Sequence, residues 1–405
     1  MKKLYFRIYQ TILKIASSFI NWREPELLKG ENSILKLPVV LNKKGINKLL
    51  IVTDNVIVSL NLMESLLNGL KNNSIDYLIY DKTVPNPTIE NVEEAFDIYK
   101  KEECKAIIGF GGGSSIDCAK GVAARIAVPK KEISQMKGLL KVRKKTPTLI
   151  AIPTTSGTGS EATVAAVITN SNTHEKYAIN DPVLIPSIAV LDPVLTKSLP
   201  QNITATTGMD ALTHAIESYI GKSNTNRTKT LSKESVKLIF NSLPNAYVNG
   251  SNLEVRDKMQ QASYYAGVSF TRAYVGYVHA IAHTLGGFYS IPHGLANAVI
   301  LPYVLEAYGK SVYKQLAELY DFTELKYNAQ EEAEKAKFLI HHIKQMNKMM
   351  NIPSTIKGIN INDIPTMVDR AYAEANPTYP VPRIMSKDEL KNIYYLIMED
   401  NNNHE

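Results

Sequence analysis

Between residues 48 and 153 the chain alternates short apolar runs with amphipathic stretches. Four runs have the length and composition of buried parallel strands: "KLLIVTD" at 48–54, "DYLIYD" at 76–81, "KAIIGF" at 105–110 and "TLIAIP" at 148–153. Helical patterns occupy residues 61–74 and 89–103 between them. Strands that alternate with helices predict right-handed βαβ crossovers and a parallel sheet covered on both faces.

The pattern changes near residue 198. From residue 201 onward long helical patterns dominate, as in "ATTGMDALTHAIESYI" and "EVRDKMQQASYYAGVSF", and strand patterns nearly vanish. We therefore expect a Rossmann-like α/β domain at residues 25–198 and an all-helical domain at residues 199–405.

The first 24 residues form a separate segment. Its opening, "MKKLYFRIYQTILKIASSFINW", is basic and apolar, but Arg7, Gln10 and Lys14 interrupt the apolar run, so it is too short to span a bilayer. One stripe at helical spacing comprises Tyr5, Tyr9, Ile12, Ala16 and Phe19. The pattern predicts an amphipathic helix whose stripe docks on the protein body or on a partner subunit. Loose association with a membrane surface is the alternative.

Composition narrows the class of protein. The 405 residues are 44% hydrophobic and 21% charged, which is typical of a globular protein with a substantial core. The net charge of +7 is spread thinly and no basic-aromatic module accompanies it, so we expect no nucleic-acid partner. The two cysteines, Cys104 and Cys118, lack CxxC spacing, which fits a reducing, cytoplasmic environment.

A glycine-rich loop, "GFGGGSSID" at residues 109–117, follows one predicted strand and precedes a helix. Backbone without Cβ atoms can turn tightly and offer its N–H groups, and a helix N-terminus favours phosphate. The spacing differs from the GxGxxG and GxxxxGK[ST] patterns. Such a loop also serves as a plain tight turn.

Two further strand ends carry polar groups at the same predicted edge of the sheet. Asp54 could bind a ribose hydroxyl and repel a 2′-phosphate, or it could cap a helix. "PTTSGTGSE" at residues 153–161 is a hydroxyl-rich loop. Because open α/β sheets bind ligands at the carboxyl ends of their strands, the two loops together favour a nucleotide site.

Three of the eight histidines gather within residues 269–298. His279 and His283 lie four apart on a predicted helix, and His293 stands in "IPHG", a turn or helix start. Asp210 and His214 repeat the four-residue spacing on an earlier helix. One carboxylate and three imidazoles suit a divalent transition metal, and these five residues are candidates for about four ligands. Each could also be a packed, exposed or capping residue.

Together, "IVTD", "GGGSSID", "PTTSGTGSE", "TGMDALTHAIE" and "VHAIAHTLGGFYSIPHGLANA" resemble the iron-containing (group III) alcohol dehydrogenase family. The resemblance runs from about residue 25 to 400, with the motifs in the family's order. It implies a nucleotide-binding α/β domain, a helical metal-binding domain and an active site in the cleft between them.

The resemblance also implies roles for individual residues. The metal ligands would be Asp210, His214, His279 and His293, and His283 would lie beside the nicotinamide. The cofactor-binding positions would be Asp54, Asn86, Gly112, Gly113, Ser114, Asp117, Thr154, Thr155, Thr158 and Lys176. Asp54 at the ribose position favours NAD over NADP.

The implied reaction is metal-dependent, NAD(P)-linked interconversion of alcohols and aldehydes by hydride transfer, with Fe²⁺, or alternatively Zn²⁺, as the Lewis acid. His283 could relay the alcohol proton. We expect Phe270, Tyr274 and Val275, on the helical turns before His279, to line an apolar pocket for short-chain primary alcohols.

Alternatives remain within and outside this class of enzyme. A glycerol or polyol dehydrogenase shares the fold, as does dehydroquinate synthase, against which the Asp-x3-His pair and "GGFYSIPHG" argue. A non-catalytic scaffold and a metal-binding protein without redox activity are the other two. The family resemblance further suggests a homodimer.

Overall fold

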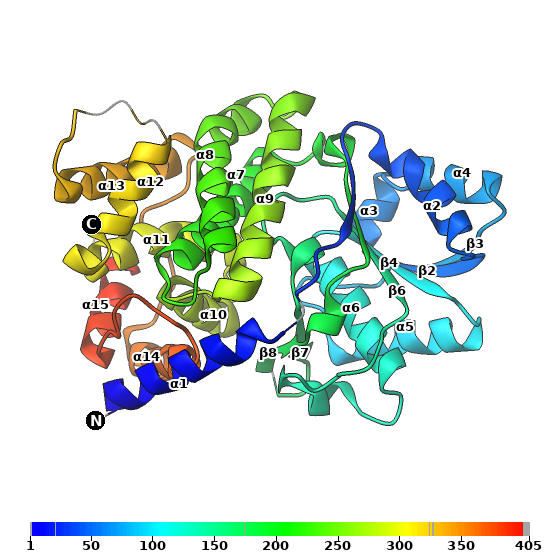
Figure 1. Ribbon diagram of the computed structural model, residues 1–405, viewed down its shortest axis with the longest axis horizontal. Helices are drawn as coiled ribbons and strands as arrows, with labels where there is room; N and C mark the ends of the chain where they lie inside the picture. The colour runs from blue at the N-terminus through cyan, green and yellow to red at the C-terminus, as the bar shows by residue number, and fades with distance from the viewer. Residues whose placement is uncertain (1, 21, 174, 324, 326–327, 400–405) are drawn as a thin grey trace. The chain divides into compact units, whose positions relative to one another are not determined.

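The computed structural model describes residues 2–20, 22–173, 175–323, 325 and 328–399 (Figure 1). The last six residues of the predicted helical domain therefore lie outside the described part. The chain divides into two compact units. One, the α/β unit, comprises Ile20–Leu199 and Ser251–Gly267; the other, the helical unit, comprises Met1–Phe19, Pro200–Gly250 and Val268–Glu405.

A six-stranded sheet, all of it parallel, forms the centre of the α/β unit. Its order is β1-β9-β6-β4-β2-β3. The strands are β1 (Glu26–Lys29), β2 (Lys48–Val52), β3 (Asp76–Tyr80), β4 (Ala106–Gly111), β6 (Thr148–Pro153) and β9 (Ile188–Leu191). The strands in the middle of the sheet are nearly continuous apolar runs because both of their faces are buried. The predicted α/β fold is confirmed.

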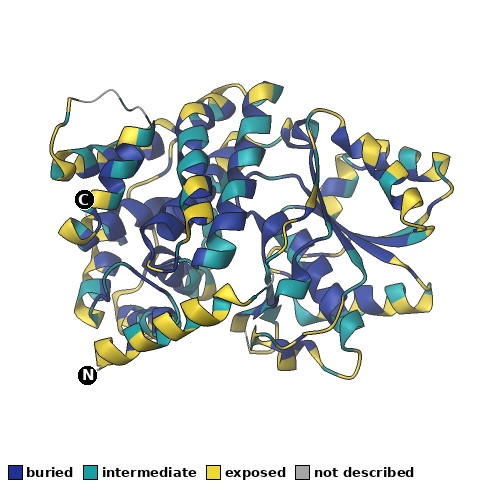
Figure 2. Ribbon diagram, viewed as in Figure 1, coloured by how far each residue is buried: buried dark blue, intermediate teal, exposed yellow. Residues whose placement is uncertain are grey.

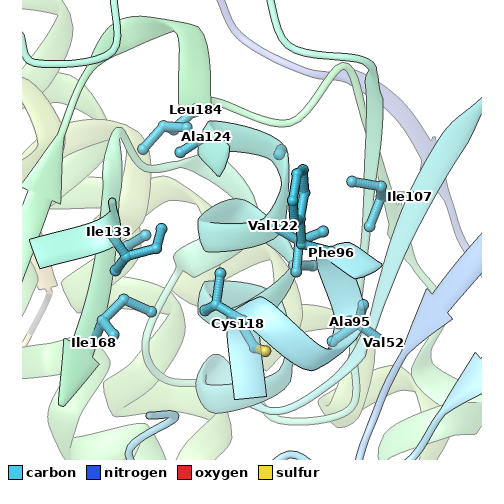
Figure 3. Packing of buried hydrophobic residues seen from close by; sticks show 14 of the residues in the cluster. Val52, Ala95, Phe96, Ile107, Cys118, Val122, Ala124, Ile133, Ile168 and Leu184 are labelled. Carbon is cyan, nitrogen blue, oxygen red and sulfur yellow. The ribbon is translucent and has the colours of Figure 1, made fainter. Parts of the chain in front are cut away.

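Helices cover both faces of this sheet. Successive side chains of a strand point to opposite faces, so Leu50 and Val52 of β2 join one core cluster and Leu49 and Ile51 the other. α5 (Ile89–Lys101) and α6 (Gly113–Ala127) complete the first cluster, in which Phe96 packs (Figure 3). α2 (Leu37–Lys43) and α4 (Glu64–Asn72) complete the second.

A second, three-stranded sheet lies beside α6 and was not predicted from the sequence. It joins β5 (Gly138–Leu139) to the antiparallel pair β7 (Ala165–Asn170) and β8 (Glu175–Asn180). The shorter elements of the α/β unit are α3 (Asn55–Ser59), η1 (Ser33–Lys36), η2 (Ile133–Met136), η3 (Ser160–Ala162), η4 (Pro182–Leu184) and η5 (Pro193–Thr196).

The helical unit contains no strand among its described residues. Its helices are α1 (Lys2–Ser18), α7 (Gln201–Ile220), α8 (Asn226–Val248), α9 (Leu253–Ala273), α10 (Tyr277–Tyr289), α11 (His293–Tyr308), η6 (Gly309–Ser311), α12 (Tyr313–Thr323), α13 (Glu332–Met349), η7 (Ile361–Asp363), α14 (Ile364–Ala375) and α15 (Lys387–Ile397). The first part of α9 belongs to the α/β unit. α7 is the central helix, since every residue from 208 to 220 is buried. The all-helical fold of this unit is the predicted one, although the unit also includes Met1–Phe19 and lacks Ser251–Gly267 of the predicted domain.

α1 is helical as predicted, but the face that docks on the rest of the helical unit is not the predicted stripe. Docking of that stripe on a partner subunit stays a prediction. Phe6 packs edge-on against Tyr372, and Gln10 donates to the carbonyl oxygen of Tyr379 at 2.8 Å. Tyr5, Ile12 and Phe19 of the predicted stripe are exposed instead. The sequence places apolar residues on two faces of this helix, so periodicity alone could not identify the docked one. Among the described residues, no helix has the length and apolarity needed to cross a membrane.

Lys120 is a fully buried cation inside the α/β unit. Its ammonium donates to the hydroxyl and carbonyl oxygens of Thr163 and to the carbonyl oxygen of Ala165, at 2.8–2.9 Å. Burial lowers its pKa to about 8, opposed by the nearby carboxylates of Asp117 and Glu161. The ammonium therefore ties α6 to the segment between η3 and β7.

We expect Lys120→Met to lower the free energy of unfolding by about 3 kcal/mol, because it removes three hydrogen bonds and leaves two carboxylates buried without their cation. Thermal and urea unfolding would measure the loss. Lys101→Met, at an exposed position on α5, is the control and should leave stability unchanged. Equal stability of the two variants would contradict the assigned role.

Candidate metal centre and nucleotide loops

α7 supplies a buried carboxylate and a buried imidazole one turn apart. Asp210 and His214 are 2% and 4% exposed, and the four-residue spacing places both on one face of the helix. The ring of Phe270, on α9, stacks on His214 with centroids 4.0 Å apart and the planes 12° from parallel. The aromatic ring thus fixes the plane of the His214 imidazole.

α10 and the start of α11 supply the other histidines. Ser290 ends α10 in the left-handed conformation, and Pro292 sets the start of α11 at His293, as the sequence predicted. Gly294 makes the return possible, because a Cβ there would lie 2.5 Å from the carbonyl oxygen of Thr206 on α7. The close approach of α11 to α7 brings His293 back towards Asp210.

The four residues predicted as metal ligands converge. Asp210, His214, His279 and His293 each offer one ligand atom, and these atoms all lie within 4.8 Å of one another. The Asp210 carboxylate lies 3.6 Å from Nε2 of His293 and 3.9 Å from Nδ1 of His214. Tetrahedral ligands at metal distances of about 2.1 Å are about 3.4 Å apart. The donor set therefore fits a divalent transition metal after small adjustments.

Glu217, one further turn along α7, holds His279 in place. Its carboxylate lies 2.6 Å from Nδ1 of His279 and accepts the N–H groups of Gly276 and Val278 at 2.8 Å. Burial raises the pKa of Glu217 to about 8. Burial also lowers the pKa of His279 well below its usual value, and the nearby imidazoles of His214, His293 and His283 lower it further. Because the proton of the imidazole lies on Nδ1, between the ring and the Glu217 carboxylate, Nε2 of His279 keeps a lone pair that can bind a cation.

The side-chain nitrogen of Asn297 lies beside atoms of three of the four predicted ligands. Its side-chain nitrogen donates to Asp210 at 2.7 Å and lies 3.1 Å from Nε2 of His293 and 3.3 Å from Nε2 of His279. Three acceptors around one donor form an electron-rich cluster, which is what a cation requires.

His283, the remaining histidine, has different partners. Its Nδ1 lies 2.7 Å from the carboxylate of Glu374, which also accepts the hydroxyl of Tyr379 at 2.8 Å. About a third of the His283 side chain is exposed, and its ring stacks on that of His293. With Nδ1 bound to Glu374, Nε2 is the ring nitrogen left to exchange a proton.

The predicted placement of the substrate-pocket residues is partly wrong. Phe270 lies on α9, but Tyr274 and Val275 lie in the link between α9 and α10 rather than on a helix. Tyr274 has φ +66°, a left-handed backbone that ends the helical pattern. Of these three residues, Phe270 alone stacks on a ring of the metal cluster, that of His214.

In the α/β unit, the predicted nucleotide residues gather after β4 and β6. Gly113, the first residue of α6, lies so close to Thr158 that a Cβ would meet its hydroxyl at 2.9 Å. The amide of Thr154 donates to the carbonyl oxygen of Gly111. Thr155 lies beside Gly112, within 4 Å of where a Cβ would be. The two loops thus form one surface around the N-terminus of α6, a place that favours phosphate.

Two more predicted positions meet nearby. Asn86 accepts the Lys176 ammonium at 2.7 Å, and its backbone N–H donates to the hydroxyl of Ser114. Lys176 comes from β8 of the hairpin that the sequence did not predict. The Asp117 carboxylate has partners within the fold, since it accepts from Ser160 and from the amide of Val167. Its contact with a cofactor stays a prediction.

Asp54 caps α3, the structural alternative considered for it. One carboxylate oxygen accepts the N–H of Ile57 at 3.1 Å, and the other accepts the hydroxyl of Ser115 at 3.2 Å. The cap leaves the negative charge at the end of β2, next to the glycine-rich loop.

Sequence reasoning missed Glu217, Asn297 and Glu374. Helical spacing could have found the first two, since Glu217 is seven residues after Asp210 and Asn297 is four after His293. Glu374 lies 91 residues from His283, and no local pattern connects them.

The residues of the metal cluster and of the nucleotide loops lie in parts of the chain that match known protein families. The family model "Iron-containing alcohol dehydrogenase" matches residues 25–193, and "Fe-containing alcohol dehydrogenase family, C-terminal" matches residues 204–398. The 1,3-propanediol dehydrogenase of Citrobacter freundii is 34% identical over 369 residues, which cover 90% of this chain and 95% of that protein. The NAD-dependent methanol dehydrogenase of Bacillus methanolicus is 33% identical over 371 residues, or 91% and 97% of the two chains. The solved alcohol dehydrogenase from Oenococcus oeni is 34% identical, with a TM-score of 0.89 over 93% of this chain and 99% of that one.

We expect Glu217→Ala to weaken Zn²⁺ binding by about tenfold to a hundredfold, because His279 loses the group that fixes its tautomer and orientation. Competition with a chromophoric chelator would measure the affinity. Glu217→Gln keeps an acceptor oxygen and should retain more affinity than Glu217→Ala. Glu306→Ala, which removes an exposed carboxylate paired with Lys344, is the control. Wild-type affinity in Glu217→Ala would contradict the assignment.

Proposed function

The chain belongs to the iron-containing alcohol dehydrogenase family, and we propose that it interconverts short-chain primary alcohols and aldehydes with NAD and Fe²⁺. As a member of that family it is an oxidoreductase. The observation that carries the proposal is the convergence of Asp210, His214, His279 and His293 on one point.

The four converging side chains hold the metal in this proposal. When bound, a divalent ion supplies Lewis acidity that stabilises an alkoxide or polarises a carbonyl. Glu217 keeps His279 in the binding tautomer, and the stacked ring of Phe270 orients His214. The donor set also suits Zn²⁺, so metal availability decides between the two ions.

His283 handles the alcohol proton. Glu374 accepts at Nδ1, so Nε2 of His283 is the atom that takes the proton from the alcohol and passes it to solvent through the exposed part of the ring. The second contact of Glu374, from Tyr379, fixes the carboxylate against the imidazole.

NAD rather than NADP is the proposed hydride carrier. The carboxylate of Asp54 at the end of β2 suits a ribose diol and repels a 2′-phosphate. The phosphates would bind the glycine-rich loop and the loop that carries Thr155 and Thr158, where close packing leaves backbone N–H groups at the N-terminus of α6.

A short, monohydric substrate fits the residues near the metal cluster better than a polyol does. The neighbour of His214 is the apolar ring of Phe270, which offers no hydrogen-bond partner to further hydroxyls. The name of the methanol dehydrogenase above also points to a small monohydric alcohol, whereas that of the 1,3-propanediol dehydrogenase names a short diol with primary hydroxyls.

We further propose a homodimer in the cytoplasm. The family resemblance supports the dimer, and the free, buried Cys104 and Cys118 support a reducing compartment.

Metal analysis of protein purified without oxygen, paired with turnover on a panel of alcohols and polyols, tests the whole proposal. We expect bound Fe²⁺ and NAD-linked oxidation of short primary alcohols. A preparation that turns over alcohols with the metal removed would overturn it, as would one that prefers polyols.

Two histidine variants should separate metal binding from proton transfer. His279→Ala removes a ligand, and we expect it to lose both the bound metal and turnover. His283→Ala should keep the metal and lower kcat by about 10²- to 10⁴-fold, the usual contribution of a general base. Metal content and kcat measured together would check this. Normal turnover in either variant would contradict the role assigned to that residue.

Asp54→Asn should reduce the preference for NAD over NADP by about tenfold, since it removes the charge that repels a 2′-phosphate. Asn caps helices as well as Asp does, so the start of α3 should persist. The ratio of kcat/KM for the two cofactors would measure the change. Asp97→Asn, on the exposed side of α5, is the matched control. An unchanged ratio in Asp54→Asn would contradict NAD selection by this residue.

A further inference from the structure

The outward face of α1 is a continuous apolar stripe. Six large side chains on it are between 52% and 85% exposed: Leu4, Tyr5, Ile8, Ile12, Ile15 and Phe19. Their spacing of one, three or four residues places them along one side of the helix. Figure 2 shows exposed residues along α1 from its start to its end.

The stripe is not the surface by which α1 holds to the protein. The opposite side docks, through Phe6 and Gln10, while Arg7 donates to the carbonyl oxygens of Val381 and Pro382. Lys14 donates to the carbonyl oxygen of Lys222. These contacts fix the rotation of α1 about its axis, so the apolar stripe stays turned outward.

The shared chemistry of the family does not account for the stripe. The matched family region begins at residue 25, after α1 has ended. The stripe also exceeds the scattered single apolar residues that ordinary surfaces carry. A side of a helix this apolar and this exposed indicates a partner.

The charges on α1 select an anionic partner. α1 carries four basic residues, Lys2, Lys3, Arg7 and Lys14, and no acidic residue. Lys2 and Lys3 are exposed at the N-terminal end, where the helix dipole and the free backbone N–H groups are also positive. Two copies of α1 packed along their stripes could form no ion pair between their side chains, because every charged side chain of the helix is basic; an anionic surface could pair with those charges.

We propose that α1 binds the surface of an anionic phospholipid bilayer, with the apolar stripe in the acyl boundary and Lys2 and Lys3 on the phosphates. A helix with Leu, Ile and Phe along one side, and with basic residues as its only charged ones, has the composition of helices that lie in a membrane interface. A helix bound in this way lies on the bilayer and does not cross it. It would hold the dehydrogenase at a membrane without involving the residues of the metal cluster.

Sedimentation of the full chain with lipid vesicles tests this. We expect wild-type protein to pellet with vesicles of phosphatidylcholine mixed with phosphatidylglycerol, and roughly tenfold less with phosphatidylcholine alone. Ile8→Gln/Ile12→Gln should lower the partition coefficient on anionic vesicles by at least about tenfold. Lys2→Gln/Lys3→Gln should lower it by roughly tenfold, and added salt should do the same.

Val248→Gln/Ile361→Gln is the matched control, since it removes two exposed apolar side chains from other elements. It should pellet as the wild type does. Absence of wild-type binding, or equal binding by Ile8→Gln/Ile12→Gln, would overturn the proposal. So would an oligomer in size-exclusion chromatography that Ile8→Gln/Ile12→Gln dissociates, which would identify a second copy as the partner. Alcohol turnover should be equal in all these variants, so a failure here leaves the proposed activity unaffected.

Discussion

A cation site needs several lone pairs directed at one point, and the helical unit is arranged around that need. Like partial charges repel one another, so four donors stay together only if the surrounding helices hold them rigidly. α7 meets this condition by being buried throughout residues 208–220, and α11 meets it by approaching α7 at Gly294. Burial also keeps His279 neutral and therefore ready to bind a metal. Packing and ligand chemistry thus favour the same arrangement.

Buried and half-buried carboxylates have different tasks in the two units. Glu217 is satisfied by backbone N–H groups and by His279, so its role is to direct an imidazole. Asp117 and Glu161 lie near the buried Lys120, and their role is to connect α6 with the chain that leads into the hairpin. Asp54 combines both roles, because it caps α3 and keeps its charge beside the glycine-rich loop. Burial alone therefore does not identify a functional carboxylate; its partners do.

The sequence predicted those features that depend on local periodicity. The central strands followed from apolar runs, and the pairs Asp210–His214 and His279–His283 followed from helical spacing, which the structure confirms. Features that depend on tertiary contacts were missed. The hairpin β7–β8 has short strands with mixed polarity, and Glu374 reaches His283 only through the packing of α14 on α10. Tyr274 was placed on a helix because a left-handed residue leaves no mark on apolar periodicity.

α1 most clearly shows the difference between what local periodicity predicts and what tertiary contacts determine. A helix with apolar residues around most of its circumference has two candidate docking faces, and the hydrophobic pattern does not distinguish between them. Polar contacts decide between them: Arg7 and Gln10 reach backbone carbonyl oxygens that only one rotation of the helix can present. In this orientation the more apolar side of α1 faces water. Burying that side against another surface would stabilise the resulting complex in proportion to the apolar area buried. Hydrogen bonds thus set the orientation of α1, and the hydrophobic effect remains available for binding.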